Sequence, residues 1–178
     1  SEIHRNADRL LTLINDIIKL SELDDQEQTF EVEQVNLYQA ARNCIQMMSM
    51  QAQKQDIKLN LIGEQCVITA NKNLIDELLY NLCSNAIRYN YRGGSVTISV
   101  RRDGTRVLLS VKDTGIGIPK KYQERVFERF YRVDKSRSKQ SGGTGLGLAI
   151  VKHIVAQHNA ELTLVSEEGK GTEIQVLF

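Results

Sequence analysis

The first part of the chain carries apolar side chains at a helical spacing. Steps of four and three residues alternate along Ile3, Ala7, Leu10, Ile14, Ile17 and Ser21. This is the a/d spacing of a coiled-coil seam, so residues 3–23 are predicted to form a long helix. Leu13, Leu20 and Leu23 widen the apolar stripe beyond what a two-stranded coil needs, which favours a helical bundle. An amphipathic helix docked on its own domain is the alternative.

After an acidic stretch at 22–33, which is typical of a linker, the pattern changes. Helices are expected over 37–53, 71–89 and 145–158, and strands over 57–61, 67–69, 95–102, 106–113, 161–166 and 172–178. Asp103-Gly104 joins two of the strands as a hairpin, and the last two strands form a second hairpin-like pair. The predicted fold class is therefore α/β, a two-layer α/β sandwich with a largely antiparallel sheet and helices stacked on one face.

Composition excludes several classes of function. The 178 residues are 41% hydrophobic and 25% charged, with a net charge of +1. These values suit one soluble domain and give no global reason to expect nucleic acid or an anionic membrane as partner. No apolar run approaches the roughly 20 residues that span a bilayer, and the first residues do not open a signal peptide. Cys44, Cys66 and Cys83 lie far apart among apolar neighbours, which indicates reduced structural thiols in a cytosolic setting.

One helix face carries polar side chains suited to a metal and to phosphates. Asn81, Asn85 and Arg88 recur at i, i+4 and i+7, so they project from the same face. Side-chain amides provide oxygen ligands for Mg²⁺, and an arginine one turn further is a phosphate partner. Taken alone, the same face is also typical of a solvated polar helix.

Three glycine-bearing segments extend this chemistry. Asp113-Thr114-Gly115-Ile116-Gly117-Ile118 follows a strand, where glycines allow close approach of a flat ligand and the carboxylate can accept from an exocyclic amine such as that of adenine. Gly142-Gly143-Thr144-Gly145-Leu146-Gly147-Leu148 opens a helix, where backbone N–H groups form an anion site. It fits neither the P-loop nor the dinucleotide fingerprint. Gly169-Lys170-Gly171-Thr172 is, by itself, typical of a turn.

The segment between Pro119 and Ser141 is basic. It holds eight Lys or Arg residues against three Asp or Glu residues, together with four aromatic residues, Tyr122, Phe127, Phe130 and Tyr131. A glycine-flanked basic loop with aromatic anchors is suited to a lid over a polyphosphate. A surface for single-stranded nucleic acid is the alternative, but the asparagine helix has no role in it.

Four of these segments together resemble a known family. In chain order, Asn81-x-x-x-Asn85-Ala86-x-Arg88-Tyr89, Asp113-x-Gly115-x-Gly117, Phe127-Glu128-Arg129-Phe130-Tyr131-Arg132 and Gly143-Thr144-Gly145-Leu146-Gly147-Leu148 resemble the N, G1, F and G2 boxes of bacterial two-component sensor histidine kinases, of the phosphate-sensor-like class. Residues 36–178 resemble their ATP-binding catalytic domain, with a lid at 118–142. Residues 1–25 resemble the second helix of their dimerisation and phosphoacceptor hairpin, and 26–35 is the expected linker.

The resemblance implies a Bergerat ATP-binding fold, a mixed, mainly antiparallel five-stranded sheet backed by three helices and preceded here by one coiled-coil-type helix. It implies ATP and Mg²⁺ as cofactors, with Asn85 and Asn81 at the metal and Asp113 on the adenine amine. Arg132 is the candidate for contacting the γ-phosphate during transfer, and Arg137 is a second. The other nucleotide-binding positions that it implies are Arg88, Tyr89, Gly115, Gly117, Ile118, Gly143, Thr144, Gly145, Leu146, Gly147 and Thr172.

Asn81 also bears on the reaction. Gyrase-like and heat-shock relatives carry a glutamate at this position, which acts as general base on water. An amide cannot take a proton from water, so phosphoryl transfer to histidine is expected instead of hydrolysis. None of His4, His153 and His158 stands in the family's acceptor motif, so the chain is expected to be cut between the two helices of the hairpin.

The implied partners are the phosphoacceptor hairpin of the same kinase, homodimeric in the full protein, and the receiver domain of a response regulator. No nucleic acid and no direct membrane contact are expected, and the location is expected to be cytoplasmic, within a membrane sensor. A serine kinase of the anti-sigma type and a nucleotide-binding module without catalysis remain alternatives. An acid-stable product would favour the first of these, and ATP binding without transfer would favour the second.

Overall fold

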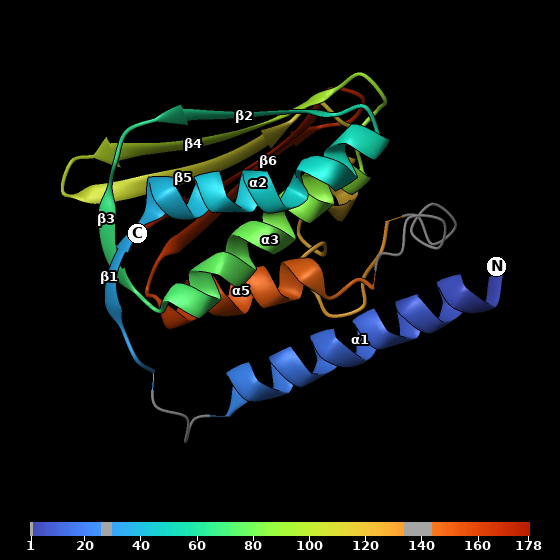
Figure 1. The fold of residues 1–178 in the computed structure, drawn as a ribbon, viewed down its shortest axis with the longest axis horizontal. Coiled ribbons are helices and arrows are strands. Elements are labelled where there is room, and N and C mark those ends of the chain that lie inside the picture. Colours follow the sequence, from blue (N-terminus) through green and yellow to red (C-terminus); the bar gives the residue numbers. More distant parts are fainter. Residues whose placement is uncertain (1, 26–29, 134–143) are drawn as a thin grey trace.

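A computed structural model describes residues 2–25, 30–133 and 144–178. The chain forms a two-layer domain with one further helix packed against it (Figure 1). The helices are α1 (Glu2–Asp24), α2 (Leu37–Lys54), α3 (Lys72–Arg88) and α5 (Gly147–Gln157), with a short 3-10 helix, η1 (Lys120–Tyr122). The strands are β1 (Glu33–Asn36), β2 (Lys58–Gly63), β3 (Val67–Ala70), β4 (Ser95–Asp103), β5 (Arg106–Asp113), β6 (Glu161–Glu167) and β7 (Gly171–Leu177).

Five strands form one mixed sheet in the order β2-β4-β5-β7-β6. β2 runs parallel to β4, and the other neighbours are antiparallel, which confirms both predicted hairpins. Helices α2, α3 and α5 cover one face of the sheet (Figure 1). Ile98, Leu109 and Val176 point into this interface and are buried. The predicted α/β sandwich, with its five-stranded sheet and three helices, is confirmed.

Asparagine caps fix where two of the helices begin. The side chain of Asn36 accepts a hydrogen bond from the N–H of Gln39 at 3.0 Å, and that of Asn71 accepts from the N–H of Leu74 at 3.0 Å. Each cap satisfies a donor that the helix itself leaves open. The start of α3 is thereby fixed, and with it the orientation of the polar face that carries Asn81, Asn85 and Arg88.

A second, two-stranded sheet was not predicted. β1 pairs antiparallel with β3, and β1 occupies the end of the segment 26–35 that was expected to be a linker. A strand of four residues offers too few positions for its alternation to stand out from a charged sequence. Its stability comes from pairing with β3 and from burial of Val35, neither of which is visible locally.

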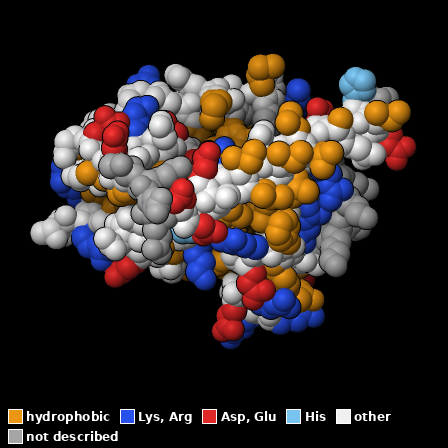
Figure 2. All heavy atoms as spheres, turned by 90° about the horizontal axis from the view of Figure 1, so that it is seen from below, with side chains coloured by type: hydrophobic (Ala, Val, Ile, Leu, Met, Phe, Trp, Pro, Cys, Tyr) orange, Lys and Arg blue, Asp and Glu red, His pale blue; other side chains and the backbone are white. Residues whose placement is uncertain are grey.

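α1 has two apolar stripes that face in different directions. Leu13, Leu20 and Leu23 pack against the core of the domain beside α5, and the Nε2 of Gln157 donates to the carbonyl of Leu23 at 3.2 Å. The predicted coiled-coil seam is instead exposed: Ile3, Leu10, Ile14 and Ile17 keep 45–78% of their surface in solvent. Figure 2 shows hydrophobic side chains gathered along the outer face of α1. The alternative of a helix docked on its own domain is confirmed for the inner stripe, and the helical bundle stays a prediction for the exposed one.

Candidate functional site

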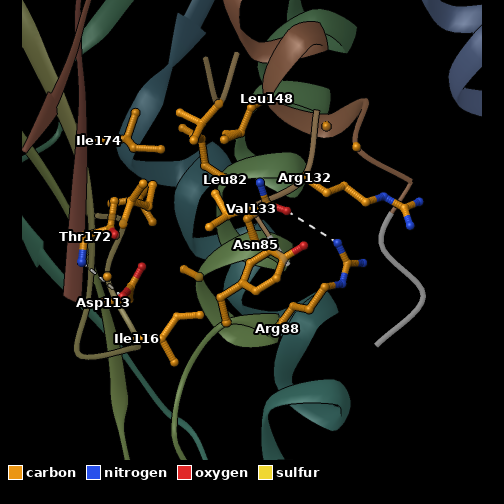
Figure 3. Close-up of a pocket in the computed structure, with 18 of the residues that line it drawn as sticks. Leu82, Asn85, Arg88, Asp113, Ile116, Arg132, Val133, Leu148, Thr172 and Ile174 are labelled. Atoms are coloured by element: carbon orange, nitrogen blue, oxygen red, sulfur yellow. Dashed lines mark hydrogen bonds between the residues drawn. The ribbon is translucent and has the colours of Figure 1, made fainter. Parts of the chain in front are cut away.

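A pocket opens between the sheet and the segments that precede α5 (Figure 3). α3, the end of β5 with the loop after it, residues 126–133, the start of α5 and β7 all contribute to its walls. Most of the nucleotide-binding positions expected from the sequence line it, namely Asn85, Arg88, Tyr89, Asp113, Gly117, Ile118, Arg132, Thr144, Gly145, Gly147 and Thr172. The fold thus brings residues from all four boxes to one cavity.

The remaining expected positions lie elsewhere. Gly115 contributes its backbone N–H to Asp113, and the side chain of Leu146 is fully buried in the core. Asn81 lies behind the pocket wall and is 8% exposed. Arg137 and Gly143 fall outside the described residues, as does the part of the expected lid at 134–142.

Asp113 lies at one end of the pocket with one carboxylate oxygen fixed by the backbone. Its Oδ1 accepts from the N–H of Gly115 at 2.8 Å and from the N–H of Thr172 at 3.1 Å. Burial raises the pKa of Asp113 to about 6, although the two N–H donors favour the ionised form and oppose this shift. Both hydrogen bonds from the described part of the chain go to Oδ1, which leaves Oδ2 available to an amine donor of a ligand.

Two glycines allow the segments around Asp113 to approach one another. Gly117 has φ +66°, and a Cβ there would lie 2.0 Å from the carbonyl oxygen of Glu167. Gly171 has φ +123°, and a Cβ there would lie 2.1 Å from the carbonyl oxygen of Asp113 itself. A side chain at either position would push the β6–β7 turn away from the carboxylate, so glycine is required by both conformation and space.

Two residues that sequence reasoning missed hold the base of the lid. The Oγ of Ser166 accepts from the N–H of Ile118 at 2.8 Å and lies 2.8 Å from the Oγ1 of Thr172. The Nε2 of Gln123 donates to the carbonyl oxygens of Ile118 and Ser166 at 2.9 and 3.0 Å. Neither residue stands in a motif, so nothing in the local sequence singled them out.

At the other end of the pocket two amide oxygens converge on the start of α5. A Cβ on Gly147 would lie 3.2 Å from the Oδ1 of Asn81 and 3.8 Å from the Oδ1 of Asn85. Nη1 of Arg88 donates to the same Asn85 oxygen at 3.4 Å, drawn as a dashed line in Figure 3. Paired amide oxygens beside a guanidinium fit a hard cation that is bound together with phosphates.

The described residues offer no alternative metal cage. Among residues 2–25, 30–133 and 144–178, no three His, Cys, Asp or Glu side chains gather closely enough to hold a metal. An ion at Asn81 and Asn85 would therefore depend on ligands from a nucleotide and from water, the mode that Mg²⁺ prefers at phosphate sites.

Positive charge accumulates at this end of the pocket from three elements. Burial lowers the pKa of the Arg132 guanidinium, and the neighbouring charges of Arg9 on α1 and Arg88 on α3 lower it further. Figure 3 shows the side chains of Arg88 and Arg132 on the side opposite Asp113. Sequence reasoning missed Arg9, because it stands in the helix that was assigned to dimerisation only.

The F and G2 segments pack directly on each other. The N–H of Phe130 donates to the carbonyl oxygen of Gly145 at 2.9 Å. Gly145 has φ +78°, and a Cβ there would lie 2.9 Å from the backbone of Phe130. The two boxes, 11 or more positions apart in the chain, thus form one wall of the pocket.

α1 reaches this wall through two acidic side chains. The Oγ1 of Thr144 donates to the Oδ2 of Asp16 at 2.7 Å, and burial raises the pKa of Asp16. Asp24 accepts from the Nη2 of Arg129 at 2.8 Å and lies 2.7 Å from the Nε2 of His153. The hydrogen bond from Arg129, followed by the one from His153, lowers the pKa of Asp24. α1 is therefore connected both to the base of the lid and to α5.

Comparisons with known proteins agree with this geometry. Residues 70–178 match the family described as "Histidine kinase-, DNA gyrase B-, and HSP90-like ATPase". The chain is 40% identical over 171 residues to the sensor histidine kinase WalK of Bacillus subtilis (strain 168), an alignment that covers 94% of this chain and 28% of WalK. It is 39% identical over 173 residues to the sensor-like histidine kinase SenX3 of Mycolicibacterium smegmatis, covering 97% of this chain and 44% of SenX3.

Solved structures share the fold over nearly the whole chain. Full-length ShkA in complex with AMPPNP superposes with a TM-score of 0.84 at 28% identity, covering 97% of this chain and 36% of ShkA. The histidine kinase ThkA in complex with the response regulator protein TrrA superposes with a TM-score of 0.78 at 22% identity, covering 99% of this chain and 48% of that one. The chain thus spans less than half the length of each of these relatives.

Proposed function

The chain belongs to the histidine kinase-, DNA gyrase B- and HSP90-like ATPase family, as the ATPase domain of a sensor histidine kinase, and from this premise we propose that it binds Mg-ATP and transfers the γ-phosphoryl group to a histidine. One observation carries the proposal. The half-buried carboxylate of Asp113, which suits an adenine amine, lies at one end of the pocket; the amide of Asn85 with the guanidinium groups of Arg88 and Arg132, which suit a triphosphate, line the other end.

The chain's own groups divide the work of binding along the pocket. The Oδ2 of Asp113 accepts the hydrogen bond of the adenine amine, while Oδ1 stays fixed by Gly115 and Thr172. Arg88 and Arg132 offset the charge of the phosphates. The amide oxygens of Asn81 and Asn85 would hold Mg²⁺, which would supply charge neutralisation at the phosphates. Catalysis then rests on positioning and charge, because phosphoryl transfer needs little covalent chemistry from the protein.

Transfer is favoured over hydrolysis because, within α3, no carboxylate is left unengaged beside the amide pair to act as a base on water. Asn81 carries an amide, which cannot take up a proton from water. The nearest carboxylate along the helix, Glu77, has both oxygens engaged: Oε1 accepts from the Nδ2 of Asn81 at 3.2 Å and Oε2 from the Nζ of Lys19 at 2.6 Å. A neutral imidazole is already nucleophilic and needs no such base.

The acceptor histidine is proposed to lie on a helical hairpin that α1 belongs to. The exposed seam of α1, with Ile14 and Ile17 at its centre, is suited to pack against the other helix of the hairpin and a second copy of it, giving a homodimer. The phosphoryl group would then pass to an aspartate of a response-regulator receiver domain. No helix in the described parts of the chain is long and apolar enough to cross a membrane, and we place the domain on the cytoplasmic side of a sensor.

The test has two parts. Calorimetry with ATP and MgCl₂ should detect binding at one site, and a hairpin protein that bears the acceptor histidine should become labelled from γ-³²P-ATP. The label should be lost in acid, because phosphohistidine is acid-labile, and retained in base. An acid-stable label would support a serine kinase instead, and binding without any labelled hairpin would support a nucleotide-binding module.

A further inference from the structure

Asn81 is held by a residue that belongs to none of the four boxes. Its amide is buried, and its Nδ2 donates both to the backbone carbonyl of Glu77 at 2.9 Å and to the Oε1 of Glu77 at 3.2 Å. The carbonyl oxygen and the carboxylate Oε1 of Glu77 are both hydrogen-bond acceptors. The amide nitrogen must therefore face them, because an amide oxygen in that place would be repelled.

This orientation decides what Asn81 presents to the pocket. With Nδ2 turned towards Glu77, Oδ1 points towards Gly147, where it lies 3.2 Å from the position of a Cβ and converges with the Oδ1 of Asn85. A flipped amide would present two N–H groups to the same place. A cation there would lose an oxygen ligand and face a positively polarised group, so the direction of the amide controls whether the site can hold a metal.

The second carboxylate oxygen of Glu77 is taken by a cation from α1. The Nζ of Lys19 lies 2.6 Å from Oε2, and the Glu77 side chain is 19% exposed. Lys19 faces the domain from the same side of α1 as Asp16, which accepts a hydrogen bond from Thr144 in the lining of the pocket. A chain of contacts thus leads from α1 through Glu77 to the amide of Asn81.

We propose that Glu77 is a positioning residue, which fixes the Asn81 amide with its oxygen towards the divalent cation of the bound nucleotide, and that Lys19 couples this orientation to the placement of α1. This inference rests on the proposed function, since it concerns the Mg-ATP site. Because coupling between two sites is reciprocal, docking of α1 and binding of the metal–nucleotide complex stabilise each other.

Glu77→Gln keeps the shape of the side chain but removes one of its two acceptor oxygens. Glutamine has one acceptor oxygen where glutamate has two, so Lys19 and Asn81 compete for it. The ammonium group forms the stronger, charge-assisted hydrogen bond. The glutamine NH₂ is then left facing Asn81 and favours the flipped amide. Removing the competitor with Lys19→Met frees the oxygen for Asn81, so the double variant should regain what the single variant loses.

The experiment is calorimetric titration of residues 1–178 with AMPPNP, in 5 mM MgCl₂ and separately in EDTA. Glu77→Gln should weaken binding about tenfold in MgCl₂ and less than about twofold in EDTA. Lys19→Met alone should cost about twofold in MgCl₂, and Glu77→Gln with Lys19→Met should return to within about twofold of the wild type. Thermal melting of each variant verifies the fold.

A matched pair on the same helix serves as control. Lys72 and Asp76 form an ion pair at 3.4 Å with side chains 59% and 47% exposed, and neither side chain is bonded to Asn81 in the described structure. Asp76→Asn and Lys72→Met remove the same charges and should leave both affinities unchanged, because exposed pairs contribute little.

Each outcome decides something. Equal weakening of Glu77→Gln in MgCl₂ and in EDTA, or no weakening at all, overturns the positioning role. A magnesium-specific loss that Lys19→Met does not restore overturns the coupling to α1. Should Glu77→Gln melt below the titration temperature, Lys19→Met alone decides, and its magnesium-specific loss supports the inference. If the wild type itself takes up no nucleotide with magnesium, the proposed function has failed rather than this inference.

Discussion

The two ends of the pocket are built in different ways. The adenine end is made within the sheet and its connecting turns: Asp113 ends β5, and its hydrogen-bond donors come from Gly115 and from Thr172 at the start of β7. β5 and β7 are paired antiparallel neighbours, so the strands themselves fix this geometry. The adenine end is consequently preformed by the same contacts that stabilise the fold.

The phosphate end is assembled from segments that the sheet does not hold. Its groups come from α3, the base of the lid, the start of α5 and α1, and contacts such as Thr144 to Asp16 and Arg129 to Asp24 join residues 105 or more positions apart. The Arg129–Asp24 pair is half-exposed, with side-chain exposures of 51% and 46%, so solvent screens it. From this comparison we expect recognition of adenine at the proposed site to be rigid, and handling of the phosphates to depend on where α1 lies.

The largest effect is expected at the rigid end. Asp113→Asn places an amide opposite the adenine amine, so two donors meet, and it removes the charge that the N–H groups of Gly115 and Thr172 stabilise. Loss of a hydrogen bond to a charged group predicts about 100-fold weaker ATP binding in calorimetry. Asp103→Asn, on the exposed β4–β5 turn, makes the same chemical change and should have no effect. Equal affinities for the two variants would remove Asp113 from the site.

The pKa of the same carboxyl predicts a pH dependence. Since burial raises the pKa of Asp113 to about 6, the free protein carries the carboxylate above pH 6 and the protonated acid below it. The adenine amine needs the ionised carboxylate as its acceptor. The affinity for ATP should therefore be at its maximum at pH 8 and about tenfold lower at pH 5. Asp113→Asn should have a flat profile over this range. A wild-type profile equally flat would contradict the assignment.

Gly147→Ala tests the phosphate end of the pocket. Alanine is favoured over glycine in a helix by up to about 1 kcal/mol, so the melting temperature should stay the same or rise. The added methyl lies 3.2 Å from the Oδ1 of Asn81 and 3.8 Å from that of Asn85, which should weaken AMPPNP binding about fivefold in MgCl₂. Titration in EDTA provides the control, where the loss should be smaller. Weaker binding together with a lower melting temperature would point to general damage instead.

The smallest effect is expected at the contact between α1 and the lid. Asp24→Asn removes the charge shared by Arg129 and His153, so the base of the lid should exchange its amide hydrogens about twofold faster. Because the pair lowers the pKa of Asp24, its contribution is present at neutral pH and is lost as the pH falls below the ordinary range of an aspartate. Asp8→Asn, on the exposed side of α1, is the matched control. An identical exchange rate in the two variants would show that the contact has no influence on the lid.

α1 illustrates how far patterning alone reaches. Its apolar stripe predicted a helix correctly, and the extra leucines at 13, 20 and 23 indicated more than a two-stranded coil. The pattern could not tell which residues face the domain, because a/d spacing describes any apolar seam. Arg9, Asp16 and Lys19 share the inner side of the helix. Their spacing gave no reason to connect them with a nucleotide pocket, because the residues that line it come much later in the chain.

Periodicity and the four boxes are local signals, so the sequence predicted the helices, the strands of the main sheet and most of the polar residues that line the pocket. Asp113 and the Asn81, Asn85 and Arg88 face could be named without coordinates because each needs only its own element. Only the folded structure reveals the pairing of β1 with β3, the hydrogen bonds of Ser166 and Gln123, and the contacts of Lys19 and Glu77. These depend on distances between segments far apart in the chain, which no local pattern of residues encodes.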